Sequence, residues 1–205
     1  MRHVRSSASA AEAEMHRQTL LKCSPALALV ALASCGARDA ASQRANGGPA
    51  VENATLTKLS LTSTAFADGQ AIPAQYTCDG AGQSPPLKWG EPPQRTKSFA
   101  LVVDDPDAPS GLFRHWGAYD IPPTTRAIGQ GESIGRQAVN DFGKPGYGGP
   151  CPPPGHGPHH YHFKLYALDV DKLGVSPGAK VKELESAVKP HMIGVGELVG
   201  IYERK

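Results

Sequence analysis

The order of apolar and polar residues along the chain is typical of short strands joined by turns. Residues 98–104 are apolar at five consecutive positions, which favours a strand buried on both faces of a sheet. From residue 159 onward the pattern alternates: His159, Tyr161 and Phe163 fall on one side, and His160 and His162 fall on the other. Further extended segments are predicted at residues 54–63, 84–89, 115–121 and 194–202. The chain is therefore predicted to be mainly β.

One helix is predicted near the C-terminus. Within residues 179–189, Val181, Leu184 and Val188 recur at helical spacing, with Lys and Glu opposite them. Residues 129–148 form a long Gly-rich loop, a kind of segment that is usually functional in a compact domain. Residues 148–158 are nearly all Pro and Gly, which predicts a rigid loop leading into the alternating strand. A length of 205 residues, with 23 Gly and 19 Pro, fits one β domain.

The first 35 residues are predicted to be a targeting segment that takes no part in the fold. A basic stretch precedes an apolar core at residues 25–32, which is too short to span a bilayer. The tetrad LASC at residues 32–35 resembles the bacterial lipobox, so Cys35 would carry lipid and the protein would be an exported, membrane-anchored lipoprotein of the periplasm or cell surface. The alternative is an ordinary secretory signal with a chance Cys. Residues 36–53 are predicted to be a flexible tether.

The charge of the mature part gives no basis for nucleic-acid binding. The chain has 21 basic and 19 acidic residues, and the first 35 residues hold four of the basic and two of the acidic ones. The remainder is balanced at 17 of each, without a basic run. A nucleic-acid partner is therefore not expected.

Two cysteines remain beyond the targeting segment, Cys78 and Cys151. In an oxidising compartment they would form one disulfide, tying the loop at residues 76–82 to the Pro-rich loop. Two neighbouring buried thiols are the alternative, because two cysteines define no spacing pattern.

Polar side chains gather where the predicted strands begin or end. Asp105 and Asp107 follow the strand at residues 98–104 in a Pro-rich loop, and His115 begins the next strand. His159 and Tyr161 begin the alternating strand. If the strands at 98–104 and 159–167 are neighbours in one sheet, these five groups meet at one rim and can form a binding site.

Five sequence blocks carry a resemblance to a known family. They are DPDAP at 105–109, HW at 115–116, NDFG at 140–143, GPCPP at 149–153 and HHY at 159–161. In this order they resemble the signature blocks of the phosphatidylethanolamine-binding protein family, above all its bacterial branch of Raf-kinase-inhibitor-like proteins. The resemblance spans about residues 54–204. It implies a domain at 54–205 in which a large central antiparallel sheet packs on a smaller sheet, with a C-terminal helix.

The resemblance also implies a small pocket that takes phosphate, acetate, cacodylate or a phosphoethanolamine head group. The matching ligand-binding positions are Asp105, Asp107, His115, Pro153, His159 and Tyr161. Backbone N–H groups near Gly149 would add donors for an anion. Asp105 would orient His115 or His159 and raise the pKa of that imidazole, so anion binding should weaken above neutral pH.

Two details of the family pattern bear on this chain. The bond between Ala108 and Pro109 matches one that family members hold in the cis form. His160 stands where an Arg is usual between the His and the Tyr, and the chain also differs by having His156, Pro158 and His162 nearby. These differences affect the preference for the head group.

We interpret the pocket as a binding module without catalytic residues or a cofactor. Its ligand would be a small anion or phosphorylated head group, and a protein partner would be modulated as kinase- or protease-inhibiting relatives do. The alternative is a hydrolase in which the Asp and His side chains serve acid–base chemistry. A metal centre is not expected, because His160 and His162 face away from His159 on the strand.

Overall fold

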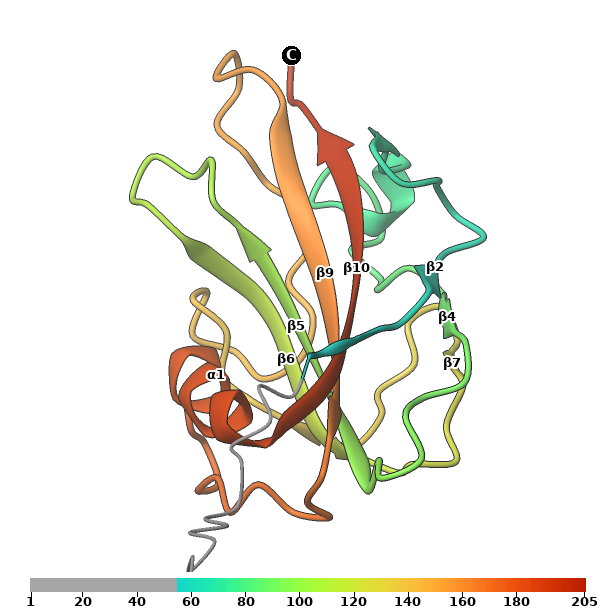
Figure 1. The fold of residues 1–205 in the computed structure, drawn as a ribbon. Helices are drawn as coiled ribbons and strands as arrows, with labels where there is room; N and C mark the ends of the chain where they lie inside the picture. Colours follow the sequence, from blue (N-terminus) through green and yellow to red (C-terminus); the bar gives the residue numbers. More distant parts are fainter. Residues whose placement is uncertain (1–54) are drawn as a thin grey trace, which may run out of the picture. The chain divides into compact units, whose positions relative to one another are not determined.

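The computed structural model describes residues 55–205 (Figure 1). The predicted targeting segment at 1–35, with Cys35, and the predicted tether at 36–53 lie outside the described residues. Within residues 55–205, a large sheet lies between a small sheet on one side and helix α1 on the other (Figure 1).

Seven strands form the large sheet. Its order is β1 (Thr57–Lys58), β10 (Met192–Tyr202), β9 (His159–Leu168), β5 (Ser98–Asp105), β6 (Phe113–Ile121) and β8 (Arg136–Gln137), and β3 (Gln70–Ala71) also pairs with β10. The strands from β10 to β8 pair antiparallel, whereas β1 and β3 add to the outer edge of β10 in parallel. The predicted fold class is confirmed, with the difference that the large sheet is mixed at its β10 edge.

The small sheet consists of β2 (Leu61–Thr62), β4 (Leu87–Trp89) and β7 (Ala127–Ile128), paired antiparallel in that order. The single strand predicted at residues 54–63 is split between the two sheets. The chain leaves the edge of β10 after β1 and crosses to the small sheet, which lets both Leu59 and Leu61 become buried. A short 3₁₀ helix at Ala74–Tyr76 follows β3.

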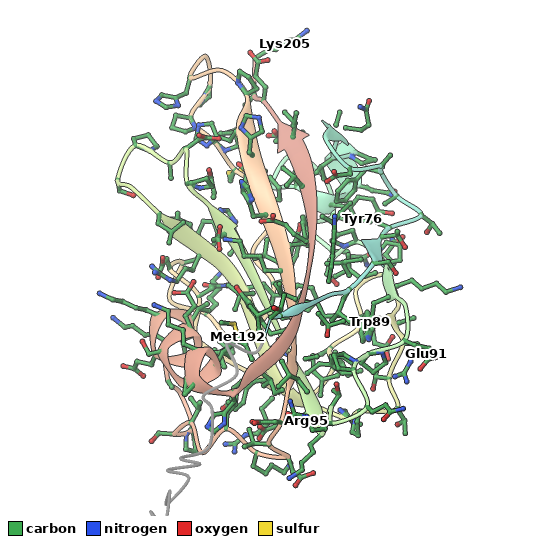
Figure 2. All side chains as sticks on the ribbon, viewed as in Figure 1. Tyr76, Trp89, Glu91, Arg95, Met192 and Lys205 are labelled. Carbon is green, nitrogen blue, oxygen red and sulfur yellow. A yellow bond between two sulfur atoms is a disulfide. The ribbon has the colours of Figure 1, made fainter. Side chains whose placement is uncertain are left out.

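The apolar residues of β5 face two different cores, which explains why the strand is apolar on both sides. Phe99, Leu101 and Val103 pack between the two sheets. Ala100 and Val102 pack on the opposite face, against helix α1. Figure 2 shows side chains filling the space between the large sheet and the segments that carry Tyr76 and Trp89, which belong to the first core.

Helix α1 (Val181–Val188) confirms the predicted helix, and a 3₁₀ turn at Lys189–His191 follows it. It buries Val181, Leu184 and Val188 against β5 and β6. Gly117 of β6 permits this close approach, because a Cβ there would lie 2.7 Å from a methyl carbon of Val181. No helix among the described residues is both long and apolar enough to cross a membrane.

Strand β6 has one extra residue at each of two places along its pairing with β5. Val103 pairs with Trp116 and the next residue of β5 pairs with Arg114, so His115 has no partner of its own. A second shift lies near Asp120, which has a φ of 54°. Extra residues of this kind are β-bulges, which re-aim side chains that would otherwise alternate strictly. The first bulge bears directly on the site described next.

Candidate functional site

A cavity of about 300 Å³ lies where β5 ends and where β6 and β9 begin. It lies at the end of the large sheet at which Figure 1 marks the C-terminus. The polar side chains that line it are Asp105, Ser110, His115, His159 and Tyr161. Its apolar wall includes Pro109, Phe113, Phe142, Pro152 and Pro153. The cavity therefore combines five hydrogen-bonding side chains with an aromatic and proline-rich wall.

Pairing between β5 and β9 brings the two halves of the site together. Asp104 of β5 lies opposite His162 of β9, which confirms that these strands are neighbours. The alternation predicted for β9 is also confirmed, since His159, Tyr161 and Phe163 are buried. The acidic end of β5 and the imidazole end of β9 thus meet at one rim.

The bulge in β6 turns His115 toward this cavity. Arg114 reaches the helix side of the sheet, where its Nε donates to Glu185 of α1 at 2.7 Å. Trp116 packs between the two sheets. In a regular strand the adjacent His115 would therefore point to the opposite face, the helix side. Because His115 is the extra residue, it lines the cavity together with Phe113 instead. Its ring centroid lies 5.1 Å from that of Tyr161.

Asp105 orients His159. An oxygen of the buried Asp105 carboxylate lies 2.7 Å from Nδ1 of His159, and the other oxygen accepts the backbone N–H of Asp107 at 2.9 Å. A carboxylate only accepts, so Nδ1 of His159 carries the proton of this bond. The Nε2 atom of His159 lies 2.8 Å from Nδ1 of His156. The three side chains therefore form one hydrogen-bonded row.

His115 is held by the backbone rather than by Asp105. Its Nδ1 lies 2.8 Å from the carbonyl oxygen of Gly148 and donates to it. Burial lowers the pKa of His115, although the Gly148 carbonyl and the charge of Asp105 act in the opposite direction. The charge of Asp105 thus acts on the pKa of His115 in the expected direction, but desolvation outweighs it, and the net pKa is lowered.

The hydroxyl of Tyr161 is buried and has no hydrogen-bond partner among the described residues. Burial, together with the charge of Asp105, raises the pKa of this phenol. The hydroxyl thus keeps its proton, and a buried donor without an acceptor is unfavourable by about 1–3 kcal/mol. It is the one polar group of the cavity wall that is fully buried and unsatisfied within residues 55–205.

Two of the predicted ligand positions do not line the cavity. The Asp107 carboxylate accepts from the backbone N–H of His160 at 2.8 Å and from its Nδ1 at 2.7 Å, and these bonds lower the pKa of Asp107. Gly149 packs against the 3₁₀ segment, where a Cβ would lie 2.7 Å from the carbonyl oxygen of Tyr76. Asp107 ties the loop after β5 to β9, and Gly149 permits a close backbone approach.

The bond between Ala108 and Pro109 is trans, because the described residues contain no cis peptide bond. The cis prediction is wrong for a local reason. The N–H of Gly111 donates to the carbonyl of Ala108 at 2.8 Å, which closes a turn with Pro109 at its second position. Proline at that position fits a trans turn, whereas a cis-proline occupies the third position.

A disulfide joins Cys78 and Cys151, with 5.4 Å between their Cα atoms. The N–H of Cys78 also donates to the carbonyl of Pro150 at 3.0 Å. Cys151 lines the cavity. These links hold the Pro-rich wall of the cavity against the segment that follows the 3₁₀ helix.

Within residues 55–205, no group of three or more His, Cys, Asp or Glu side chains is arranged to hold a metal ion. The two other histidines of β9 face away from the cavity. His160 pairs with Asp107, and His162 pairs with Glu197.

Sequence reasoning gave no individual role to Phe113 or Phe142, and it did not predict the contact of His156 with His159. Phe113 and Phe142 line the cavity, and their rings lie 5.0 Å and 5.3 Å from that of His115. Phe142 is 45% exposed. Its place as an aromatic residue in a Gly-rich loop was the one feature of the sequence that could have pointed to a role at the site. His156, flanked by two glycines, was visible in the sequence as well, but its contact with His159 depends on the loop conformation.

Fold and cavity together define a class of protein: a two-sheet β domain with a small pocket at the strand ends, built from imidazoles, a tyrosine and prolines. The family model described as Phosphatidylethanolamine-binding protein matches residues 62–203. The chain belongs to the phosphatidylethanolamine-binding protein family.

Curated relatives and solved structures agree with this membership. A UPF0098 protein of Pyrococcus horikoshii is 51% identical over 157 residues, covering 72% of this chain and 79% of the relative. LppC of Mycobacterium tuberculosis, whose name describes it as a lipoprotein, is 40% identical over 201 residues and covers 92% of this chain and 98% of the relative.

Two crystal structures resemble the fold. The homologue CT736 of Chlamydia trachomatis is 39% identical, with a TM-score of 0.68 over 73% of this chain and 99% of that chain. YbcL of Escherichia coli, described as a member of the mammalian PEBP family, is 33% identical, with a TM-score of 0.68 over 72% of this chain and 99% of that chain.

Proposed function

We propose that the protein is a non-enzymatic binding module for a small anion, of which a phosphorylated head group is the preferred form. The single observation that carries the proposal is the hydroxyl of Tyr161, a residue that lines the cavity: this hydroxyl is buried and has no acceptor among the described residues. A ligand oxygen would satisfy this donor and remove its desolvation penalty. A cavity of about 300 Å³ is at the small end of ligand pockets, which favours a head group over a larger molecule.

The state of His115 gives the proposal a pH dependence. Because Nδ1 donates to Gly148, a neutral His115 offers only a lone pair at Nε2. Because a phosphate oxygen is also an acceptor, a hydrogen bond between it and Nε2 requires a proton between the two atoms, carried either by the imidazole or by a phosphate monoanion. Because burial lowers the pKa of His115, the free pocket lacks this proton near neutral pH. Binding therefore takes up a proton and strengthens as the pH falls, the direction expected from the sequence.

A protein partner would contact the mouth of the pocket. Leu112 and Phe142 are each 45% exposed, and Leu56 is the other large hydrophobic side chain that is exposed among the described residues. Phe142 lines the cavity, and Leu112 precedes Phe113, which also lines it, so two segments of the cavity wall carry exposed apolar side chains that would form an apolar rim. Such a rim suits a partner that presents an anionic group on an apolar surface, in the manner of kinase- or protease-inhibiting relatives.

Export and membrane anchoring through Cys35 form part of the same proposal. The support comes from the tetrad at residues 32–35 and from LppC, which is similar over 92% of this chain. A membrane-anchored binding module would meet phosphorylated head groups at the lipid surface.

A hydrolase that works through a covalent intermediate would need an activated nucleophile beside the imidazoles. Ser110 lines the cavity, yet no hydrogen bond among the described residues joins it to His115 or His159. The binding role is therefore preferred.

Calorimetry on protein purified without phosphate tests the proposal. O-phosphorylethanolamine and inorganic phosphate should bind with one-to-one stoichiometry, whereas ethanolamine should not bind. The proposal is contradicted if neither phosphate compound binds, or if p-nitrophenyl phosphate is turned over by the protein and not by a His159→Ala variant.

A further inference from the structure

We infer that His156 is an internal competitor for Nε2 of His159 in the free protein, so that a ligand must displace His156 to bind that atom. This inference rests on the proposed function, and it adds a residue that sets the affinity of the pocket. The observation behind it is the 2.8 Å contact between Nδ1 of His156 and Nε2 of His159.

The contact uses the remaining ring nitrogen of His159. Its Nδ1–H donates to Asp105, and its Nε2 is hydrogen-bonded to His156. When His159 is neutral, Nε2 accepts the Nδ1 proton of His156; when His159 is charged, Nε2 donates to His156. In both states His159 has no hydrogen bond left for a ligand. The imidazole that the family resemblance places in the pocket is thus satisfied from within the chain.

Exposure makes His156 the displaceable partner. His159 is buried, with 1% of its surface exposed, and Asp105 fixes its ring. His156 is exposed, so its ring can rotate into water without breaking a packed core. A net hydrogen bond at such a boundary is worth about 1 kcal/mol, which a bound phosphate oxygen can replace.

The backbone on either side of His156 is suited to this movement. Gly155 and Gly157 have φ values of 71° and 93°, and nothing lies within 4 Å of a Cβ placed at either position. Only glycine adopts such angles without strain, so the present position of the His156 ring depends on both glycines. The base of the loop is fixed, because the N–H of Gly155 donates to the carbonyl of Arg204 at 2.9 Å. Movement is thereby confined to the tip that carries His156.

Two variants separate this role from a direct contact between His156 and the ligand. His156→Ala should bind O-phosphorylethanolamine about fivefold more tightly than the wild type, the factor that corresponds to one net hydrogen bond. Gly157→Ala should change affinity in the same direction, because a side chain at that φ strains the loop conformation that seats His156. His162→Ala is the matched control: His162 lies on the opposite face of β9, paired with Glu197, and its removal should leave the affinity unchanged.

Nitrogen-15 imidazole NMR supplies a readout that does not depend on affinity. The Nε2 resonance of His159 should shift in free His156→Ala, and O-phosphorylethanolamine should move the His156 signals of the wild type toward those of a solvated imidazole. Equal affinities for wild type and His156→Ala, or weaker binding by the variant, would overturn the inference and leave the binding function standing. No binding by either protein would overturn both.

Discussion

The carboxylate of Asp105 and the imidazole of His159 form a buried pair, 2.7 Å apart, that joins the end of β5 to the start of β9. The two residues are 54 positions apart in the chain, and the pairing of their strands brings them together. Because both groups are almost wholly buried, loss of either one would leave its partner with an unsatisfied hydrogen-bonding atom away from water. The pair therefore serves stability and pocket geometry together.

Replacing Asp105 should be far more costly than replacing Asp107. Asp105→Ala leaves the buried His159 Nδ1 proton without an acceptor, at about 1–3 kcal/mol, and it also removes the acceptor of the Asp107 N–H. Asp107→Ala removes a half-exposed interaction with His160 and should lose less than about 1 kcal/mol. Urea unfolding of the two variants measures the difference in the free energy of unfolding. Equal decreases in the two variants would show that the buried pair contributes no more to stability than the exposed one.

Removing the Tyr161 hydroxyl should improve stability while it impairs binding. Tyr161→Phe eliminates a buried donor that has no partner in the free protein, for a gain of about 1 kcal/mol. The same change should weaken phosphate binding about tenfold or more, because hydrogen bonds to charged groups are worth about 1.5–3 kcal/mol. Thermal unfolding and calorimetry provide the two measurements.

Tyr147→Phe is the control for this variant, since the Tyr147 hydroxyl donates to the carbonyl of Tyr76 at 2.8 Å. It should lose stability and keep its affinity. A Tyr161→Phe variant that is less stable than the wild type would mean that its hydroxyl has a partner in the free protein.

His115 should make the folded protein less stable as the pH falls. Its folded pKa is lowered by burial, so below the unfolded value of about 6.5 the unfolded chain binds more protons than the folded one. The stability contributed by neutral His115 is complete above that value and is lost as the pH falls toward the folded pKa. Unfolding free energies at several pH values between 7.5 and 5 should fall for the wild type, and less steeply for His115→Gln. Parallel pH profiles would contradict this assignment.

Loss of the disulfide should destabilise the domain and loosen the pocket. The bond closes a loop of 73 residues, for which the chain-entropy relation gives about 4 kcal/mol. The double variant Cys78→Ala, Cys151→Ala should unfold at lower urea concentration and bind phosphate more weakly, because Cys151 belongs to the cavity wall. Oxidised and reduced wild type offer the same comparison without substitution. An unchanged midpoint after reduction would refute the prediction.

Local periodicity was sufficient to predict the strands and the helix that carry the cores. The alternation of β9 and the two-sided apolar pattern of β5 are both direct consequences of where these strands lie in the sheet. Helix α1 follows from the spacing of Val181, Leu184 and Val188. The adjacency of β5 and β9, which assembles the site, needed the family resemblance as well.

What periodicity could not predict is set by backbone irregularities and loops. Strict alternation would place His115 on the helix side of the sheet, and only the bulge in β6 turns it to the cavity. The trans bond before Pro109 follows from a turn closed by Gly111, and the contact of His156 follows from two left-handed glycines. Each of these features depends on the local backbone conformation of a bulge or loop, which the alternation of apolar and polar residues does not encode.

Because of the bulge at His115, the side chain at this position lines the pocket while the pairing and packing of the strands depend on its neighbours. As an additional residue in β6, His115 has no counterpart on β5, and the neighbouring Trp116 and Gly117 keep their places in the two packed layers. An exchange at this position alters the lining that a ligand meets without leaving a void between the sheets. Position 115 is therefore the natural starting point for redesigning which head group the domain recognises.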